Sequence, residues 1–256
     1  MPKMPPETDP DSVKIDQDLL AAPIPPLSEA PGWDRVPIEE CGEPLVPLPI
    51  ENTRLRWRAL YAEQGIPNAP DIVWVRATVR DRLLQAVRAL PASLALVVFD
   101  GYRPLAVQQF LWDHYIERIG TNQPHLSAEE VIAVVRHFVA SPTASYAAPP
   151  PHRTGGAVDV YLVDRATGEP LPMGTEPDEA APESATCYFE EHLVTPVTEN
   201  RRLLFHAMTG AGFANYLGEW WHFDFGNQRW ANITGAPHAV YGVTDDPLWQ
   251  RDDPGI

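Results

Sequence analysis

Residues 94–104 have the sequence Leu-Ala-Leu-Val-Val-Phe-Asp-Gly-Tyr-Arg-Pro, in which a short apolar run ends in polar residues. The six apolar residues include two valines and are bounded by turn-forming residues, as is typical of a buried strand. This strand would carry the next four residues, Asp100 to Arg103, at its carboxyl end. Pro104 suits the first turn of a helix, which we expect to continue to about Arg118.

Three further helices are predicted on either side of this stretch. Between Ala77 and Leu90 the apolar residues recur at helical spacing, and Pro91 provides a stop. The segment Ser127–Glu130 has the residues of a capping box, whose hydroxyl and carboxylate satisfy exposed backbone N–H groups. We expect its helix to reach Val139. A last helix is predicted from about Asn200 to Met208.

Two later segments are predicted to be strands. Residues 157–162 alternate between faces as a half-buried strand does, and Thr167-Gly168 offers a turn before Leu171, so this region resembles a hairpin. The bulky residues of 219–225 favour another strand. The sequence therefore predicts an α+β fold with a mostly antiparallel central sheet flanked by helices.

The first 49 residues differ in composition from the rest of the chain. Twelve of the 29 prolines fall in residues 1–50, acidic residues collect there, and helical periodicity is absent. We interpret residues 1–49 as an extended arm and residues 50–256 as one folded domain. The arm is either disordered or wrapped over the surface. Its apolar run Pro44–Ile50 could instead pack along the core as an irregular edge.

The overall charge of the chain restricts its partners. The formal net charge is −16, and the 19 Lys and Arg residues are scattered, which argues against a nucleic-acid binder. No segment offers about 18 unbroken apolar residues, and the N-terminus lacks the features of a secretory signal. We therefore expect a cytoplasmic protein with no membrane contact and a small substrate. The oligomeric state stays open.

The cysteines point to no disulfide framework. Cys41 and Cys187 are far apart in sequence, and neither belongs to a CxxC pair. A zinc site ligated by cysteine is therefore not expected.

The segment His152-Arg-Thr-Gly-Gly-Ala-Val-Asp159 joins an imidazole to a carboxylate through a turn with two glycines. Gly155 and Gly156 permit backbone conformations that would fold His152 back beside the strand carrying Asp159. Alternation along that strand places the Asp159 carboxylate away from its apolar face. Histidine and aspartate are both ordinary zinc ligands, so this segment is a candidate metal site.

A third ligand is expected from Glu219-Trp-Trp-His222. Two histidines and one carboxylate leave the fourth zinc position open for water, and Glu219 could take a proton from that water. In a regular strand residues 219 and 222 would point to opposite faces, so the strand must begin, bend or bulge between them. The alternative is that the aromatic residues are core and His222 is a hydrogen-bonded core histidine.

Together these motifs resemble the D-alanyl-D-alanine dipeptidases, zinc peptidases of the VanX type in the larger D-Ala-D-Ala metallopeptidase family. The resemblance covers roughly residues 50–226 and follows the family's order. Its segments are Asp100–Pro104, His152 with Asp159, Met173-Gly-Thr175 followed by Asp178, Glu219–His222, and more weakly Arg56-Trp57 and Tyr61-Ala62.

The resemblance implies a role for each matched residue. His152, Asp159 and His222 would hold one Zn²⁺ per chain at the sheet face, with Glu219 as general base. Arg103 would lie at the scissile carbonyl, although an arginine in a strand-end loop is more often a surface residue. The implied reaction is hydrolysis of D-Ala-D-Ala, or a close D,D-dipeptide, to free amino acids by metal-activated water. Asp178, with Tyr61 beside it, would pair with the free ammonium of this dipeptide, unless Asp178 is simply a solvated acidic residue.

Two other functions stay open from the sequence. One is a D,D- or L,D-carboxypeptidase that acts on peptidoglycan stem peptides, and the other is a non-catalytic metal- or peptide-binding relative. Three departures from the family pattern leave the exact substrate open, namely Pro150 in place of a serine, Pro177 in place of a phenylalanine, and Ala185 in place of a histidine. The remaining histidines are assigned no metal role; they are His114, His125, His137, His192, His206 and His238.

Overall fold

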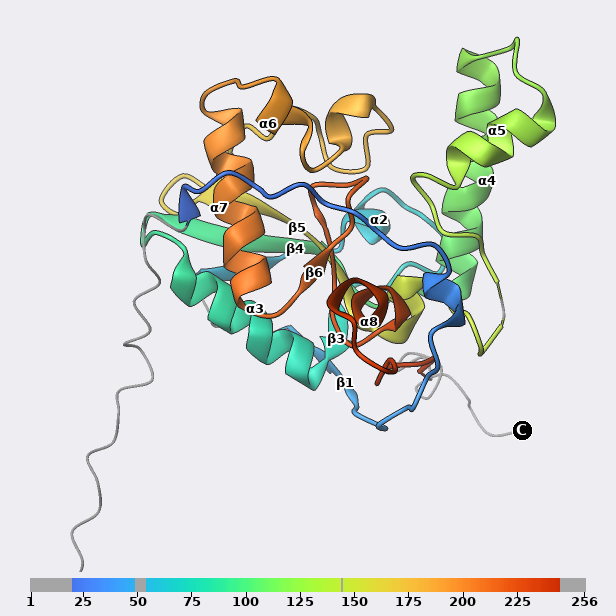
Figure 1. The fold of residues 1–256 in the computed structure, drawn as a ribbon, viewed down its shortest axis with the longest axis horizontal. Helices are drawn as coiled ribbons and strands as arrows, with labels where there is room; N and C mark the ends of the chain where they lie inside the picture. Colours follow the sequence, from blue (N-terminus) through green and yellow to red (C-terminus); the bar gives the residue numbers. More distant parts are fainter. Residues whose placement is uncertain (1–19, 49–53, 144, 245–256) are drawn as a thin grey trace, which may run out of the picture.

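The computed structural model describes residues 20–48, 54–143 and 145–244, and its centre is a five-stranded sheet (Figure 1). The strand order is β2-β4-β5-β7-β6; β2 and β4 are parallel, and the other three pairs are antiparallel. The predicted α+β fold is confirmed, and the predicted mostly antiparallel sheet is a mixed sheet because β2 joins it parallel to β4. The strands are β2 (Leu55–Trp57), β4 (Leu94–Asp100), β5 (Ala157–Asp164), β6 (Ala214–Asn215) and β7 (His222–Asp224).

The pairing of β4 with β5 brings polar residues together at one end of the sheet. All seven residues of β4 are buried, and Val98 lies opposite Val160. The register then shifts so that Asp100 lies opposite Asp159, and Asp159 in turn lies opposite His222 of β7. Three polar residues that are distant in sequence therefore lie side by side where the three strands meet.

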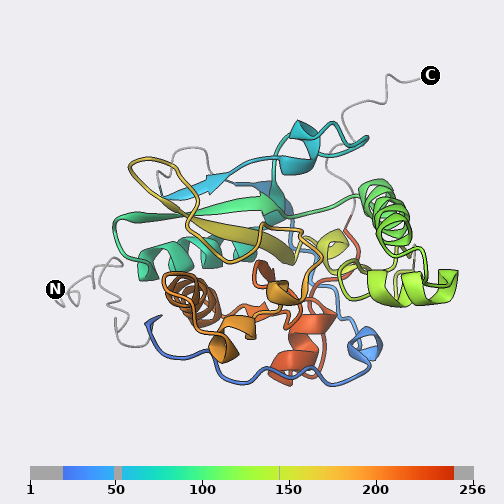
Figure 2. The same cartoon turned by 90° about the horizontal axis from the view of Figure 1, so that it is seen from above.

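Two helices pack on one face of the sheet, and two others form a separate helical pair at one side of the molecule (Figure 2). The helices α3 (Ala77–Ala89) and α7 (Val197–Gly210) lie on the same face of the sheet, where their apolar residues join the main core (Figure 2). The helices α4 (Leu105–Asn122) and α5 (Ala128–Val135) pack together around an apolar cluster of their own. The shorter elements are α2 (Leu60–Glu63), α6 (Tyr188–Glu191), α8 (Gln228–Thr234), and the 3-10 helices η1 (Trp33–Arg35), η2 (Pro151–Thr154) and η3 (Pro182–Ser184).

Several predicted boundaries are corrected by the structure. The capping box is present, with Ser127 accepting from the Glu130 amide, but α5 ends at Val135 rather than Val139 because the chain then turns. The strand predicted over 219–225 is shorter, since the Glu219 amide bonds to the Tyr216 carbonyl in a turn. After β5 the hairpin is reduced to a single bridge between Val163 and Pro170.

The described part of the N-terminal arm lies along the body of the molecule (Figure 1). The Ala22 carbonyl lies 2.8 Å from Nε2 of His206 on α7, and the Ala30 carbonyl accepts from Asn232 on α8. Further on, β1 (Leu45–Pro47) pairs with β3 (Trp74–Arg76) in a separate two-stranded sheet. Residues 1–19 and 49–50 of the predicted arm and apolar run lie outside the described residues. No described helix has both the length and the apolar character needed to cross a bilayer.

Candidate metal centre and active site

A tight glycine turn brings His152 to the end of the sheet. Gly155 has φ of 71°, and a Cβ on Gly156 would lie 2.4 Å from the Phe225 carbonyl oxygen, so this turn needs both glycines. Nδ1 of His152 lies 2.8 Å from the Gly101 carbonyl oxygen, just after β4. The predicted folding of His152 back towards the strand that carries Asp159 is therefore observed.

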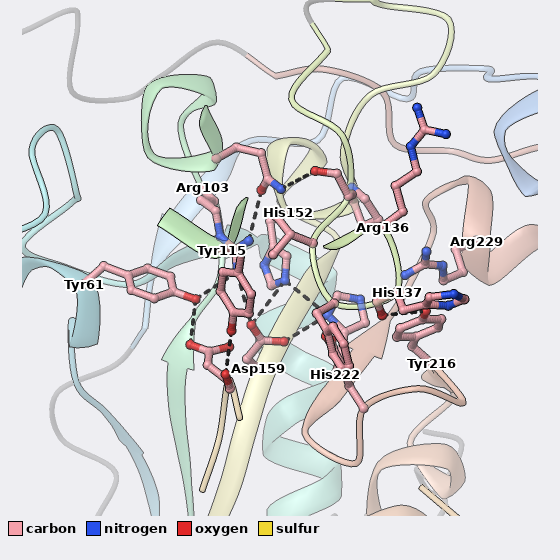
Figure 3. A pocket seen from close by; sticks show the side chains of 17 residues that line it. Tyr61, Arg103, Tyr115, Arg136, His137, His152, Asp159, Tyr216, His222 and Arg229 are labelled. Atoms are coloured by element: carbon pink, nitrogen blue, oxygen red, sulfur yellow. Dashed lines mark hydrogen bonds and ion pairs between the residues drawn. The ribbon is translucent and has the colours of Figure 1, made fainter. Parts of the chain in front are cut away.

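The structure gathers the three predicted metal ligands into one buried cluster (Figure 3). Nδ1 of His222 lies 2.9 Å from Oδ1 of Asp159, and Nε2 of His152 lies 3.3 Å from Oδ2 of the same carboxylate. The two imidazole nitrogens are 3.2 Å apart. One donor atom from each residue lies within 4.8 Å of the others, so the three side chains converge on one point.

The hydrogen bonds around this cluster fit a bound cation. The outer nitrogens are His152 Nδ1, which faces the Gly101 carbonyl, and His222 Nε2, which lies 3.2 Å from Asp224 Oδ2. Since a carbonyl and an ionised carboxylate only accept hydrogen bonds, these outer nitrogens carry protons. In neutral imidazoles the inner nitrogens then offer lone pairs. Together with Asp159 they form three acceptors that face one another, an arrangement that a metal ion satisfies.

Glu219 lies in the turn that precedes β7 and faces the same cavity. Because the strand begins only at His222, the opposite parity of residues 219 and 222 does not separate them. The predicted strand break between the two residues is therefore present. The Glu219 side chain is buried, and burial raises the pKa of its carboxyl to about 8.

Arg103 is buried beside the cluster and fixed by several acceptors. Its guanidinium donates to Asp100 Oδ2 at 2.7 Å, to Gln108 Oε1 at 3.0 Å and to Asp159 Oδ2 at 3.3 Å. Burial opposes its charge, but the nearby carboxylates, Asp100 foremost, hold the pKa of Arg103 above its usual value. It is therefore a buried, oriented cation rather than a surface arginine.

Asp178 and Tyr61 form the adjoining part of the cavity wall. Tyr61 Oη donates to Asp178 Oδ2 at 2.9 Å and accepts from Arg103 at 3.2 Å. Burial, with a smaller effect of the Asp159 charge, raises the pKa of Asp178 to about 6. All seven residues singled out in the sequence line one cavity.

Asp224, which hydrogen-bonds to the outer nitrogen of His222, was not predicted as a site residue from the sequence. This fully buried carboxylate also accepts from Asn227 Nδ2, at 2.5 Å. Burial opposes a charged ring, but Asp224 and Asp159 outweigh it and raise the pKa of His222 to about 10, so a metal ion at Nδ1 would have to displace a proton. The signal for Asp224 was the His-x-Asp spacing, since residues two apart in a strand share a face.

Other cavity residues had no such signal. They come from α4, from the turn after α5 and from the segments around β7; they are Gln108, Tyr115, Arg136, His137, Tyr216 and Arg229. His137, predicted to lie within a helix and given no role, therefore lies on the cavity wall beyond the end of α5.

Replacing Asp224 with asparagine is expected to lower the affinity for metal by about 10- to 100-fold. This is the usual effect of mutating a residue that hydrogen-bonds to the outer nitrogen of a metal-bound histidine. The asparagine side chain can still accept a hydrogen bond from His222 Nε2, but it lacks the negative charge that makes the imidazole a stronger metal ligand. Competition with a chromophoric chelator measures the affinity. Asp81→Asn, at an exposed position, is the matched control. Equal metal affinities for the wild-type protein, Asp224→Asn and Asp81→Asn would contradict the role of Asp224.

A family model described as D-ala-D-ala dipeptidase matches residues 68–240. The chain belongs to the D-Ala-D-Ala dipeptidase family. It is therefore a metallopeptidase, and the resemblance seen in the sequence motifs is confirmed.

Named relatives of this dipeptidase-family chain include a D-alanyl-D-alanine dipeptidase of Synechocystis sp., 36% identical over 218 residues, covering 77% of this chain and 87% of the relative. One of Streptomyces coelicolor is 33% identical over 182 residues, covering 66% and 85% of the two chains. Among solved structures, the vancomycin resistance D,D-pentapeptidase VanY in complex with Zn(II) is 16% identical, with a TM-score of 0.35 over 82% of this chain and 97% of that one.

Proposed function

We propose that this chain is a zinc-dependent dipeptidase that hydrolyses D-Ala-D-Ala, or a close D,D-dipeptide, to free amino acids. The observation that carries the proposal is the shared cavity, in which a His-Asp-His cluster, a buried glutamate, a buried arginine and Asp178 face one another. The names of the relatives support the substrate class.

The ligand set is suited to a catalytic zinc ion. His152, Asp159 and His222 would hold it, leaving one position free for water or substrate. When bound there, zinc supplies Lewis acidity to the attacking water and to the scissile carbonyl.

Glu219 and Arg103 are then placed to act on the reacting atoms. Glu219 takes a proton from the attacking water and returns it to the nitrogen of the leaving amine. The Arg103 guanidinium stabilises the negative charge that develops on the carbonyl oxygen, and its fixed orientation means that little reorganisation is needed.

Asp178 gives a reason for preferring a free N-terminus. With Tyr61 holding one of its oxygens, the carboxylate can pair with the ammonium of a dipeptide. An acylated peptide offers no such cation and would leave the Asp178 carboxylate without a cationic partner. This favours a dipeptidase over a carboxypeptidase acting on stem peptides.

Free alanine release from three substrates tests the proposed function. We expect the zinc-loaded protein to hydrolyse D-Ala-D-Ala, to act far less on L-Ala-L-Ala and N-acetyl-D-Ala-D-Ala, and to lose activity when a chelator is added. Equal hydrolysis of blocked and unblocked D-Ala-D-Ala would overturn the role of Asp178 and favour a carboxypeptidase. No turnover of any peptide would favour a non-catalytic binding module.

The cellular role stays a prediction. A cytoplasmic dipeptidase of this kind would serve the recycling of cell-wall dipeptides, or the removal of the dipeptide that glycopeptide antibiotics require.

A further inference from the structure

One cation on the cavity wall has no part in the proposed chemistry. Arg229, in α8, lines the cavity together with the metal cluster. Figure 3 shows Tyr61 on one side of the cluster and Arg229 with Tyr216 on the other. Since Tyr61 bonds to Asp178, Asp178 and Arg229 lie on different sides of the cluster.

Aromatic rings and the N-terminal arm hold Arg229 in place. Its guanidinium carbon lies 4.2 Å from the centre of the Tyr216 ring and 4.8 Å from that of Trp33. Its Nε donates to Glu29 Oε1 at 3.2 Å, and both side chains are nearly buried, at 11% and 13% exposure. Trp33 and Glu29 both belong to the arm, so a segment distant in sequence orients this arginine.

The hydrogen bonds of Arg229 leave one edge of its guanidinium free. Among the described residues, Nε is the only nitrogen of this group with a protein hydrogen-bond partner. An arginine offers five N–H groups in a planar fork, and its two terminal nitrogens can bind a carboxylate through two parallel hydrogen bonds. The free edge therefore suits a carboxylate ligand.

We propose that Arg229, oriented by Glu29 and Trp33 of the N-terminal arm, binds the C-terminal carboxylate of the dipeptide. This assignment rests on the proposed function. A dipeptide is a zwitterion, so with its ammonium at Asp178 and its amide at the metal cluster, its carboxylate extends towards the far wall. A cation at that wall makes the site selective for a substrate of one length, charged at both ends.

Two other basic residues outside the proposed chemistry also line the cavity, Arg136 and His137. Both follow the end of α5, are exposed to solvent, and make no ion pair within the described chain. Because exposed, unrestrained side chains lose more rotamer freedom on binding, Arg229 is the better carboxylate partner. A variant of Arg136 tests this choice directly.

The test compares D-Ala-D-Ala with its C-terminal amide, which keeps the scissile bond but lacks the carboxylate charge. We expect wild-type protein to prefer the free acid. In Arg229→Gln, KM for D-Ala-D-Ala should rise about 10- to 100-fold, the range for a lost charged hydrogen bond, while kinetics on the amide barely change. The preference for the acid should then disappear.

Arg202→Gln is the matched control, because Arg202 is also paired with a glutamate, Glu190 at 2.6 Å, and also contacts the arm, but does not line the cavity. It should keep the wild-type preference. If Arg229→Gln does not fold, Arg229→Lys, which keeps the charge without the fork, should show a smaller loss of preference. Circular dichroism and zinc content report folding for each variant.

The outcomes separate this assignment from the proposed function. No turnover of D-Ala-D-Ala by zinc-loaded wild-type protein would overturn both. Wild-type turnover with an unchanged preference in Arg229→Gln, or a preference lost in Arg136→Gln instead, would overturn only the assignment of Arg229. A loss of kcat of equal size on acid and amide would likewise show that Arg229 does not bind the carboxylate.

Discussion

Replacing Glu219 with glutamine is expected to lower kcat for D-Ala-D-Ala by about 10³-fold, within the range of general acid–base catalysis, while the protein keeps its zinc. Glutamine preserves the size of the side chain and its place in the turn before β7. It removes the carboxylate oxygen that takes the proton from water in the proposed mechanism. Because the proposed metal ligands are other residues, zinc content and kcat should separate in this variant.

Steady-state kinetics and zinc content measured on the same preparation check this result. The exposed Glu169→Gln, in the loop after β5, is the matched control and should retain wild-type kcat and zinc. Near-normal turnover by Glu219→Gln would remove Glu219 from the mechanism. A fall in zinc content parallel to kcat would instead make Glu219 part of the metal site.

His222→Ala is expected to lose both the metal and the activity. The substitution removes one of the three proposed ligands and leaves the buried carboxylates of Asp159 and Asp224 without their shared partner. Removing one member of such a buried network costs about 3–5 kcal/mol, so the free energy of unfolding should fall as well. The effect on metal binding should exceed that of Asp224→Asn, which keeps all three ligands.

Zinc content after dialysis, alanine release and denaturant unfolding measure these three losses. The exposed His125→Ala serves as the control, since it removes an imidazole outside the cavity. If His222→Ala retained stoichiometric zinc and turnover, the metal would have to be held elsewhere, and the cluster at the end of the sheet would not be the catalytic centre.

Strand β4 and the helix α3 that precedes it were predictable because their signals are local. Strand β4 is a continuous apolar run, and α3 repeats its apolar residues at helical spacing before Pro91. The capping box at Ser127 also formed as predicted, since its hydrogen bonds join residues three apart. Where the prediction was wrong, as at the end of α5, a turn begins without a strong breaker residue.

The sequence by itself determined the chemistry of the candidate site. The glycine turn between His152 and Asp159 and the Glu-Trp-Trp-His222 segment made these residues candidate metal ligands and a candidate base, because each motif joins residues that are near one another in the chain. Their meeting at one point was inferred only through the family resemblance.

Only the tertiary structure decided how these segments meet and what surrounds them. The register that aligns Asp100, Asp159 and His222 depends on pairing between strands about 60 residues apart. The Arg229 side chain is oriented by arm residues about 200 positions away. Such contacts leave no periodicity or spacing in the chain, because they are selected by the packing of the whole fold rather than by neighbours in sequence.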